Sequence, residues 1–84
     1  MNKENIKRAI MAEAALDAFR AQAGLDSFPY TVTDLISDVG HLCDVKGFDF
    51  LELMAKAIGD WKLEQTQPNG IGPRPTIRIE VAPC

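Results

Sequence analysis

The chain has 84 residues and a mass of 9.2 kDa, with 46% apolar and 25% charged residues, which allows one small globular domain. Its net charge of -3 argues against a stand-alone nucleic-acid binder, because such proteins carry a basic face. Cys43 and Cys84 form neither a disulfide framework nor a metal-binding pattern, and no apolar run has the length of a membrane span. We therefore expect a cytoplasmic protein without a metal or a cofactor.

The N-terminal segment predicts an alanine-rich helix. Asn2 is a suitable N-cap, strong helix formers continue to Ala23, and Gly24 is a typical helix stop. Apolar side chains are spread around more than one face of this helix, including Ile6, Ile10 and Met11. Two interpretations follow: the helix is well buried, or part of it forms a dimer or partner interface, because small side chains permit close helix approach.

The next segment, residues 25–32, predicts a loop. Pro29 disfavours a helical conformation at the residue before it. We expect Phe28 and Tyr30 to cover the end of the bundle, and Thr31 or Thr33 to cap the second helix.

Residues 33–65 predict a hairpin of two amphipathic helices. The first has an apolar face opposite an acidic one, and Gly47 ends it. Asp49 and Glu52 have the spacing of a capping box at the start of the second. Leu53 and Leu63 lie outside its main apolar stripe, so we expect something outside the hairpin to cover them.

The C-terminal segment predicts a linker and a strand. Residues 68–75 interleave proline and glycine, which excludes a helix. Residues 76–81 then alternate, with Ile77, Ile79 and Val81 on one side and polar residues on the other. No partner strand is evident, so three arrangements stay open: the segment lies across the helices, pairs with its copy in a dimer, or joins the sheet edge of a partner.

The predicted fold is therefore mainly α, a three-helix bundle with an extended C-terminal β-arm. The predicted division is a helical domain at residues 1–67, a Pro/Gly linker at 68–75 and the arm at 76–84.

The second predicted helix carries the candidate metal ligands and the candidate catalytic pair of the chain. Asp34, Asp38, His41 and Asp44 share one face, but a closed metal site needs ligands from a second element, so a solvated polar face is the preferred interpretation. His41 and Cys43 point about 200° apart on a helix and cannot form a nucleophile–base pair. We therefore predict no catalytic residue, and we expect Cys43 to be a small core residue.

The sequence gives little support for nucleic-acid binding. A helix-turn-helix is disfavoured because the would-be recognition helix is acidic and has no arginine. Imitation of nucleic acid by the acidic hairpin stays open. The main alternative function is a small regulator that contacts phosphates through basic residues, namely Lys3, Lys7, Arg8, Arg20, Arg74 and Arg78.

Residues 34–44 followed by 47–50 carry an Asp-Leu pair, a His-Leu-Cys-Asp run and a Gly-x-Asp-Phe run. This pattern resembles that of small proteins from bacterial phages, plasmids and integrated mobile elements. The resemblance covers residues 33–65, and the group has no assigned catalytic residues, so it provides no site. It implies a mobile-element accessory protein that acts on a host or rival system by binding.

These observations predict a non-enzymatic protein that binds a protein partner or forms a homodimer, with an inhibitor as one instance. The residues expected to contact the partner are apolar and come from the first helix, the third helix and the arm: Ile6, Ile10, Met11, Leu53, Leu63, Ile77, Ile79 and Val81.

Overall fold

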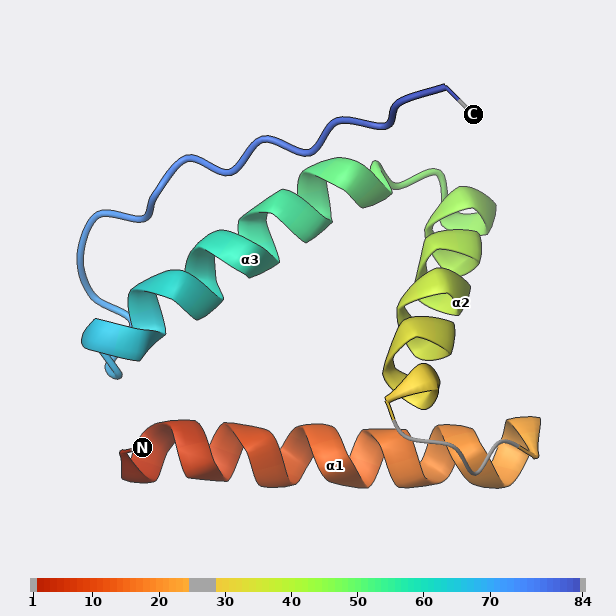
Figure 1. Ribbon diagram of the computed structural model, residues 1–84, viewed down its shortest axis with the longest axis horizontal. Helices are drawn as coiled ribbons and strands as arrows, with labels where there is room; N and C mark the ends of the chain where they lie inside the picture. The colour runs from red at the N-terminus through yellow and green to blue at the C-terminus, as the bar shows by residue number, and fades with distance from the viewer. Residues whose placement is uncertain (1, 25–28, 84) are drawn as a thin grey trace. The chain divides into compact units, whose positions relative to one another are not determined.

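The computed structural model describes residues 2–24 and 29–83, which contain three helices: α1 (Lys3–Ala23), α2 (Tyr30–Lys46) and α3 (Phe50–Thr66) (Figure 1). The predicted mainly α class is confirmed. The described residues contain no β-strand, so the predicted β-arm is wrong in that respect. Its segment is extended, but it does not pair with another strand.

The chain divides into two compact units, Met1–Phe48 and Asp49–Cys84. The first contains α1 and α2, and the second contains α3 and the C-terminal segment. This division falls within the predicted helical domain rather than at residue 67, because the linker and arm pack on α3 and belong to its unit. The three-helix bundle stays a prediction.

Local residues determine both ends of α1. The Asn2 side chain accepts a hydrogen bond from the backbone N–H of Asn5 at 2.9 Å, which satisfies one free donor of the first turn. At the other end Gly24 has a φ of 72°, and its N–H donates to the Arg20 carbonyl at 2.8 Å. Glycine adopts this left-handed conformation without steric cost, so the chain leaves the helix here. Both predicted ends are confirmed.

The start of α2 differs from the prediction. The helix begins at Tyr30, with Pro29 in the N-cap position and no side-chain cap. Proline has no N–H and a φ restricted near the helical value, so a helix can begin beside it without a threonine acceptor. Thr31 is fully buried instead, and the predicted threonine cap is wrong.

Residues 25–28, which hold most of the predicted loop and Phe28, lie outside the described residues, as does Cys84. Tyr30 is mostly exposed, so its predicted role in covering a helix end is wrong.

The α3 cap agrees with the sequence. The Asp49 carboxylate accepts a hydrogen bond from the Glu52 N–H at 3.1 Å, at the position that the predicted capping box assigns to it.

Within the first unit, α1 and α2 contact each other, and α2 begins beside the C-terminal part of α1 (Figure 1). Leu16 and Phe19 of α1 are half-buried, but no residue of α1 is buried. The interpretation of α1 as a well-buried helix is therefore wrong. Cys43 of α2 is buried, as predicted for a small core residue.

In the second unit, the extended segment runs back along α3 (Figure 1). The crossing point is Gly59: a Cβ atom added there would lie 3.3 Å from the Pro75 carbonyl oxygen and 3.7 Å from Cγ1 of Ile77. A hydrogen in place of a side chain therefore lets the arm backbone approach the helix. The arm therefore packs on α3 of its own unit, and pairing with a copy or with the sheet of a partner stays a prediction.

Candidate functional site

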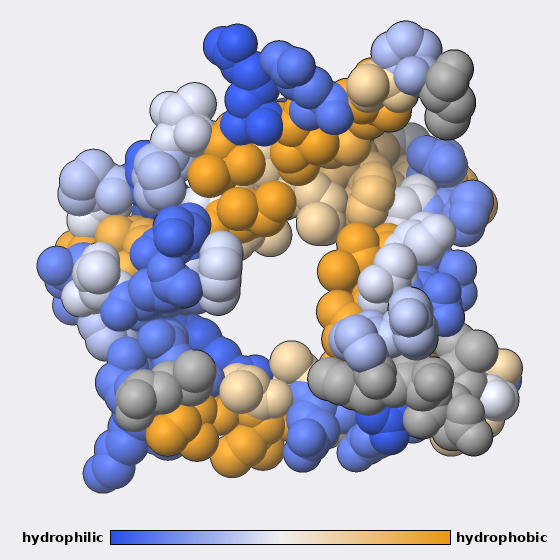
Figure 2. Space-filling model, in the orientation of Figure 1, coloured by the Kyte–Doolittle hydropathy of each residue, from blue (hydrophilic) through white to orange (hydrophobic). Residues whose placement is uncertain are grey.

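The N-terminal half of α1 carries an exposed apolar surface, which we call the α1 face and define as Ile6, Ile10 and Met11. Their exposed fractions are 45%, 61% and 66%. Ile6 and Ile10 are one helical turn apart, so their side chains are neighbours. Figure 2 shows hydrophobic residues gathered on this part of α1.

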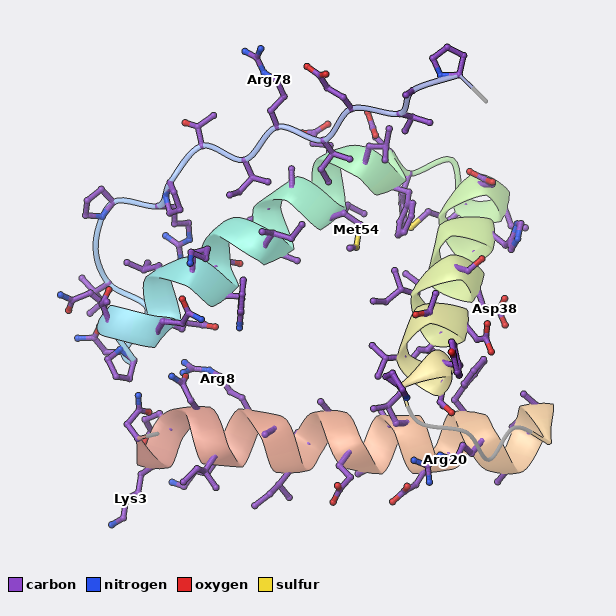
Figure 3. The ribbon with its side chains drawn as sticks, in the orientation of Figure 1. Lys3, Arg8, Arg20, Asp38, Met54 and Arg78 are labelled. Atoms are coloured by element: carbon purple, nitrogen blue, oxygen red, sulfur yellow. The ribbon has the colours of Figure 1, made fainter. Side chains whose placement is uncertain are left out.

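Charged side chains border the α1 face. At 100° per residue, Lys3 lies on the same side of the helix as Ile10, whereas Arg8 lies on the other side. Figure 3 shows Lys3 and Arg8 pointing to opposite sides of α1. Lys7 is also near this face, and its ammonium group is 3.9 Å from Glu4 in a solvent-exposed pair. Glu13 and Asp17 are exposed and lie on the same side of the helix, three and seven residues after Ile10. The surface is therefore apolar, with lysines toward its N-terminal end and carboxylates toward its C-terminal end.

The basic residues of the alternative nucleic-acid reading are largely engaged within the chain. The Arg8 guanidinium donates to Asn5 at 2.9 Å, and Arg20 is 3.7 Å from Asp17. Arg74 pairs with Asp60. This alternative stays a prediction, and the geometry adds nothing in its favour.

The polar face of α2 does not form a metal centre. Asp38, His41 and Asp44 are exposed and Asp34 is half-buried; Asp38 points outward in Figure 3. Within residues 2–24 and 29–83, no three His, Cys, Asp or Glu side chains gather closely enough to hold a metal ion.

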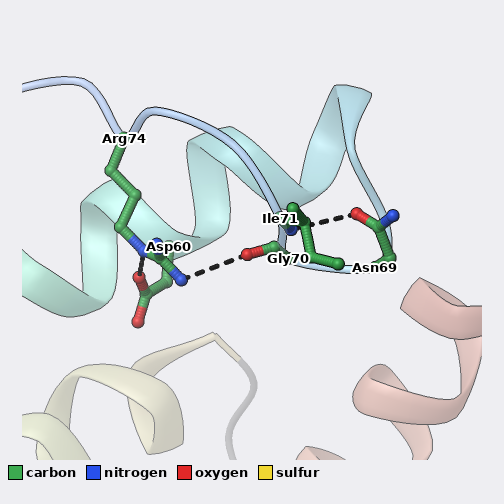
Figure 4. A network of polar contacts seen from close by, with 5 residues as sticks. All are labelled: Asp60, Asn69, Gly70, Ile71 and Arg74. Carbon is green, nitrogen blue, oxygen red and sulfur yellow. Dashed lines mark hydrogen bonds and ion pairs between the residues drawn. The ribbon is translucent and has the colours of Figure 1, made fainter.

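The linker and α3 share a set of polar contacts in the second unit. Arg74 pairs through Nε with the Asp60 carboxylate and donates from its terminal nitrogen to the Gly70 carbonyl at 3.3 Å (Figure 4). The Asn69 side chain accepts from the Ile71 N–H at 3.0 Å, which closes a turn. The Arg74 contacts join α3 to the end of the linker, and the Asn69 contact lies within the linker.

Burial alternates along the arm as the sequence predicts. Ile77 and Ile79 are half-buried, whereas Thr76, Arg78 and Glu80 are exposed. Figure 3 shows Arg78 pointing away from α3. Outside the helices, no backbone–backbone hydrogen bond within the described part of the chain involves residues 73–83. The backbone of the arm therefore forms no strand pairing within the described part of the chain.

The predicted partner-binding residues fall into three groups. Leu63 is 6% exposed, and a Cβ atom added at Gly72 would lie 3.4 Å from its Cδ1 atom, so its own linker covers it. Ile77 and Ile79 are half-buried. The other five residues are exposed at the surface: Ile6, Ile10, Met11, Leu53 and Val81.

The sequence reading did not identify Gly59 or the Asp60–Arg74 pair. A glycine in the middle of an amphipathic helix was a signal for close backbone approach, since glycine lowers helix stability unless packing requires it.

Comparison with known proteins adds no relative: no family model, no curated protein and no solved structure matches the chain. None of the helices among the described residues has both the length and the apolar character needed to cross a bilayer.

Proposed function

We propose that this protein is a non-enzymatic interaction protein that binds another protein through the α1 face. The observation that carries the proposal is the exposure of Ile6, Ile10 and Met11 on a helix that already contacts α2. Single exposed apolar residues are common on protein surfaces, but adjacent large ones on one helix are typical of a binding site.

The expected mode is insertion of a helix into a groove. Ile6 and Ile10 have the i, i+4 spacing of anchor residues in such complexes, and Ala14 continues the row with a small side chain. Lys3 and Lys7 border the row at its N-terminal end, and Glu13 and Asp17 border it at its C-terminal end. The groove that fits it therefore has an apolar floor and a rim that is acidic at one end and basic at the other. The partner is a protein with such a groove.

The biological setting proposed is that of a phage or mobile-element accessory factor, with inhibition of a host or rival protein as the form of action. It rests on the resemblance of residues 33–65 to small proteins of mobile elements.

The direct test is site-specific photo-crosslinking in the native host. A photoreactive residue at position 10 is expected to form an adduct with one protein. The matched control is the same residue at Ala12, which is exposed but lies about 160° from Ile10 and at least about 100° from Ile6 and Met11 around the helix. Ile6→Asp combined with the position-10 probe should remove the adduct, because it places a charge in the apolar contact.

Equal labelling from positions 10 and 12, or an adduct that survives Ile6→Asp, contradicts the proposal. With the purified partner, Ile10→Ala is expected to weaken binding about tenfold, since truncation of a buried aliphatic anchor costs roughly 1–2 kcal/mol. The measurement is isothermal titration calorimetry.

A further inference from the structure

The arm sequence from Ile77 to Val81 is nearly symmetric about its middle residue. Ile79 stands at the centre, with Arg78 and Glu80 on its two sides and Ile77 and Val81 beyond them. Read from either end, an aliphatic residue is followed by a charged one and then by Ile79. The two charges have opposite signs, so the segment is complementary to a reversed copy of itself.

An antiparallel pair centred on Ile79 uses this symmetry. Ile79 lies opposite Ile79 of the second copy, and each Arg78 lies opposite a Glu80 across the ribbon. Each Ile77 then lies opposite a Val81. Directly opposed side chains are the closest neighbours in such a pair, and both opposite charges and aliphatic pairs are favourable there.

Neighbouring registers lose this match. Centring the pair on Arg78 places the two arginines opposite each other, and centring it on Glu80 does the same with the two glutamates. A parallel pair in register opposes both sets of like charges. Like charges directly opposite each other are destabilising, so the sequence selects the register centred on Ile79.

The burial and hydrogen bonding of this segment favour its pairing with a second strand. Its Ile77 and Ile79 side chains are half-buried, and its backbone crosses α3 at Gly59, so α3 backs one face. Arg78 and Glu80 are exposed on the other face, and Val81 is 76% exposed. No backbone–backbone hydrogen bond of the described chain outside the helices uses residues 73–83, which leaves an open edge.

We propose that two copies of this chain associate through their arms, which pair as an antiparallel two-stranded ribbon centred on Ile79. A two-stranded ribbon alone is marginal in water, but packing on a helix stabilises it, and each arm brings its own α3. Val81 gains cover from Ile77 of the second copy. This interface uses a different surface from the α1 face, so the two proposals succeed or fail separately.

The test is a charge exchange measured by sedimentation equilibrium on the full chain. Arg78→Glu places two carboxylates opposite each other at each end of the ribbon. Glu80→Arg places two guanidinium groups opposite each other at each end. Each variant alone is expected to dimerise roughly twentyfold more weakly than the parent chain, because two attractive cross-strand pairs become repulsive. The two variants mixed in equal amounts are expected to form a heterodimer within about threefold of the parent affinity, because every opposed pair is again of opposite sign.

Lys46→Glu is the matched control for Arg78→Glu, because it makes the same change of net charge on an exposed residue of the first unit. It should leave dimerisation unchanged. Circular dichroism melting of each variant shows that the helices remain folded, so a lost dimer is not a lost fold.

Three results overturn the proposal: a parent chain that stays monomeric at millimolar concentration, single variants that dimerise as well as the parent, or a mixture no better than the single variants. Persistent dimers in both variants would place the self-interface elsewhere. A monomeric parent would leave the open edge to the sheet of a different protein.

Discussion

Helices α1 and α3 both have apolar side chains that require cover, but the chain covers them differently. Both carry more apolar side chains than one stripe, but α3 has a segment of its own chain lying along it, and α1 has no buried residue. The contrast follows from the sequence of each unit. The linker after α3 contains Gly70 and Gly72, which adopt positive φ and turn the chain back onto the helix.

This difference separates apolar residues that stabilise the protein from those available for binding. Leu63 and Ile77 contribute to the stability of the second unit, whereas Ile6 and Ile10 contribute little to the stability of the first. Hydrophobic character alone does not distinguish the two groups in the sequence, but burial does. The comparison can be tested by matched substitutions on the two helices.

The largest expected effect is at Leu63. Leu63→Ala removes a buried side chain beneath the linker and should lower the free energy of unfolding of the second unit by about 2–3 kcal/mol. Ile10→Ala on α1 should change the stability of the first unit by less than about 0.5 kcal/mol, because its side chain is already exposed. Urea unfolding followed by Trp61 fluorescence reports on the second unit, and helical circular dichroism reports on both. Equal losses at the two positions would contradict the division between stabilising and available residues.

An intermediate effect is expected at the crossing point of the arm. Gly59→Leu places a side chain where a Cβ atom already lies 3.3 Å from the Pro75 carbonyl oxygen, so the arm must move away. Displacement of the arm should lower the free energy of unfolding of the second unit by about 1–3 kcal/mol, despite the better helix propensity of leucine. Ala15→Leu is the matched control on exposed α1 and should be neutral.

Limited proteolysis gives the second measurement of the Gly59 prediction. In Gly59→Leu, cleavage after Arg78 by trypsin should become faster than in the parent chain, because a detached arm is accessible to the protease. Unchanged stability together with unchanged cleavage would show that the arm does not depend on the glycine.

The features that the sequence predicted correctly are those that a few adjacent residues determine. Asn2, Gly24 and Asp49 end their helices through hydrogen bonds or φ angles within four residues. The threonine cap failed because Pro29 starts α2 by an equally local but different route. Alternation at residues 76–81 predicted the two faces of the arm correctly, but strand pairing depends on a partner that alternation cannot supply.

The site was less predictable than the helix ends for the same reason. Exposure of Ile6 and Ile10 and burial of Leu63 depend on which segment returns to which helix. Both helices have apolar residues outside the main stripe. The turn at Gly70–Gly72 brings the linker and the arm back over α3, whereas no such turn covers α1 in the described part of the chain. The sequence left open whether α1 is well buried or forms an interface; no residue of α1 is buried, and the interface stays a prediction.

The smallest expected effect is at the ion pair between Asp60 and Arg74. Both side chains are partly exposed, with relative areas of 35% and 47%, so solvent screens their attraction. Asp60→Asn should therefore lower the free energy of unfolding of the second unit by only about 0.5 kcal/mol, and 1 M salt should reduce the difference from the parent chain. The matched control, Asp17→Asn, removes the exposed i, i+3 partner of Arg20 on α1 and should have no measurable effect on the second unit. A loss above about 2 kcal/mol in Asp60→Asn would mean that the ion pair, rather than Ile77 and Gly59, holds the arm on α3.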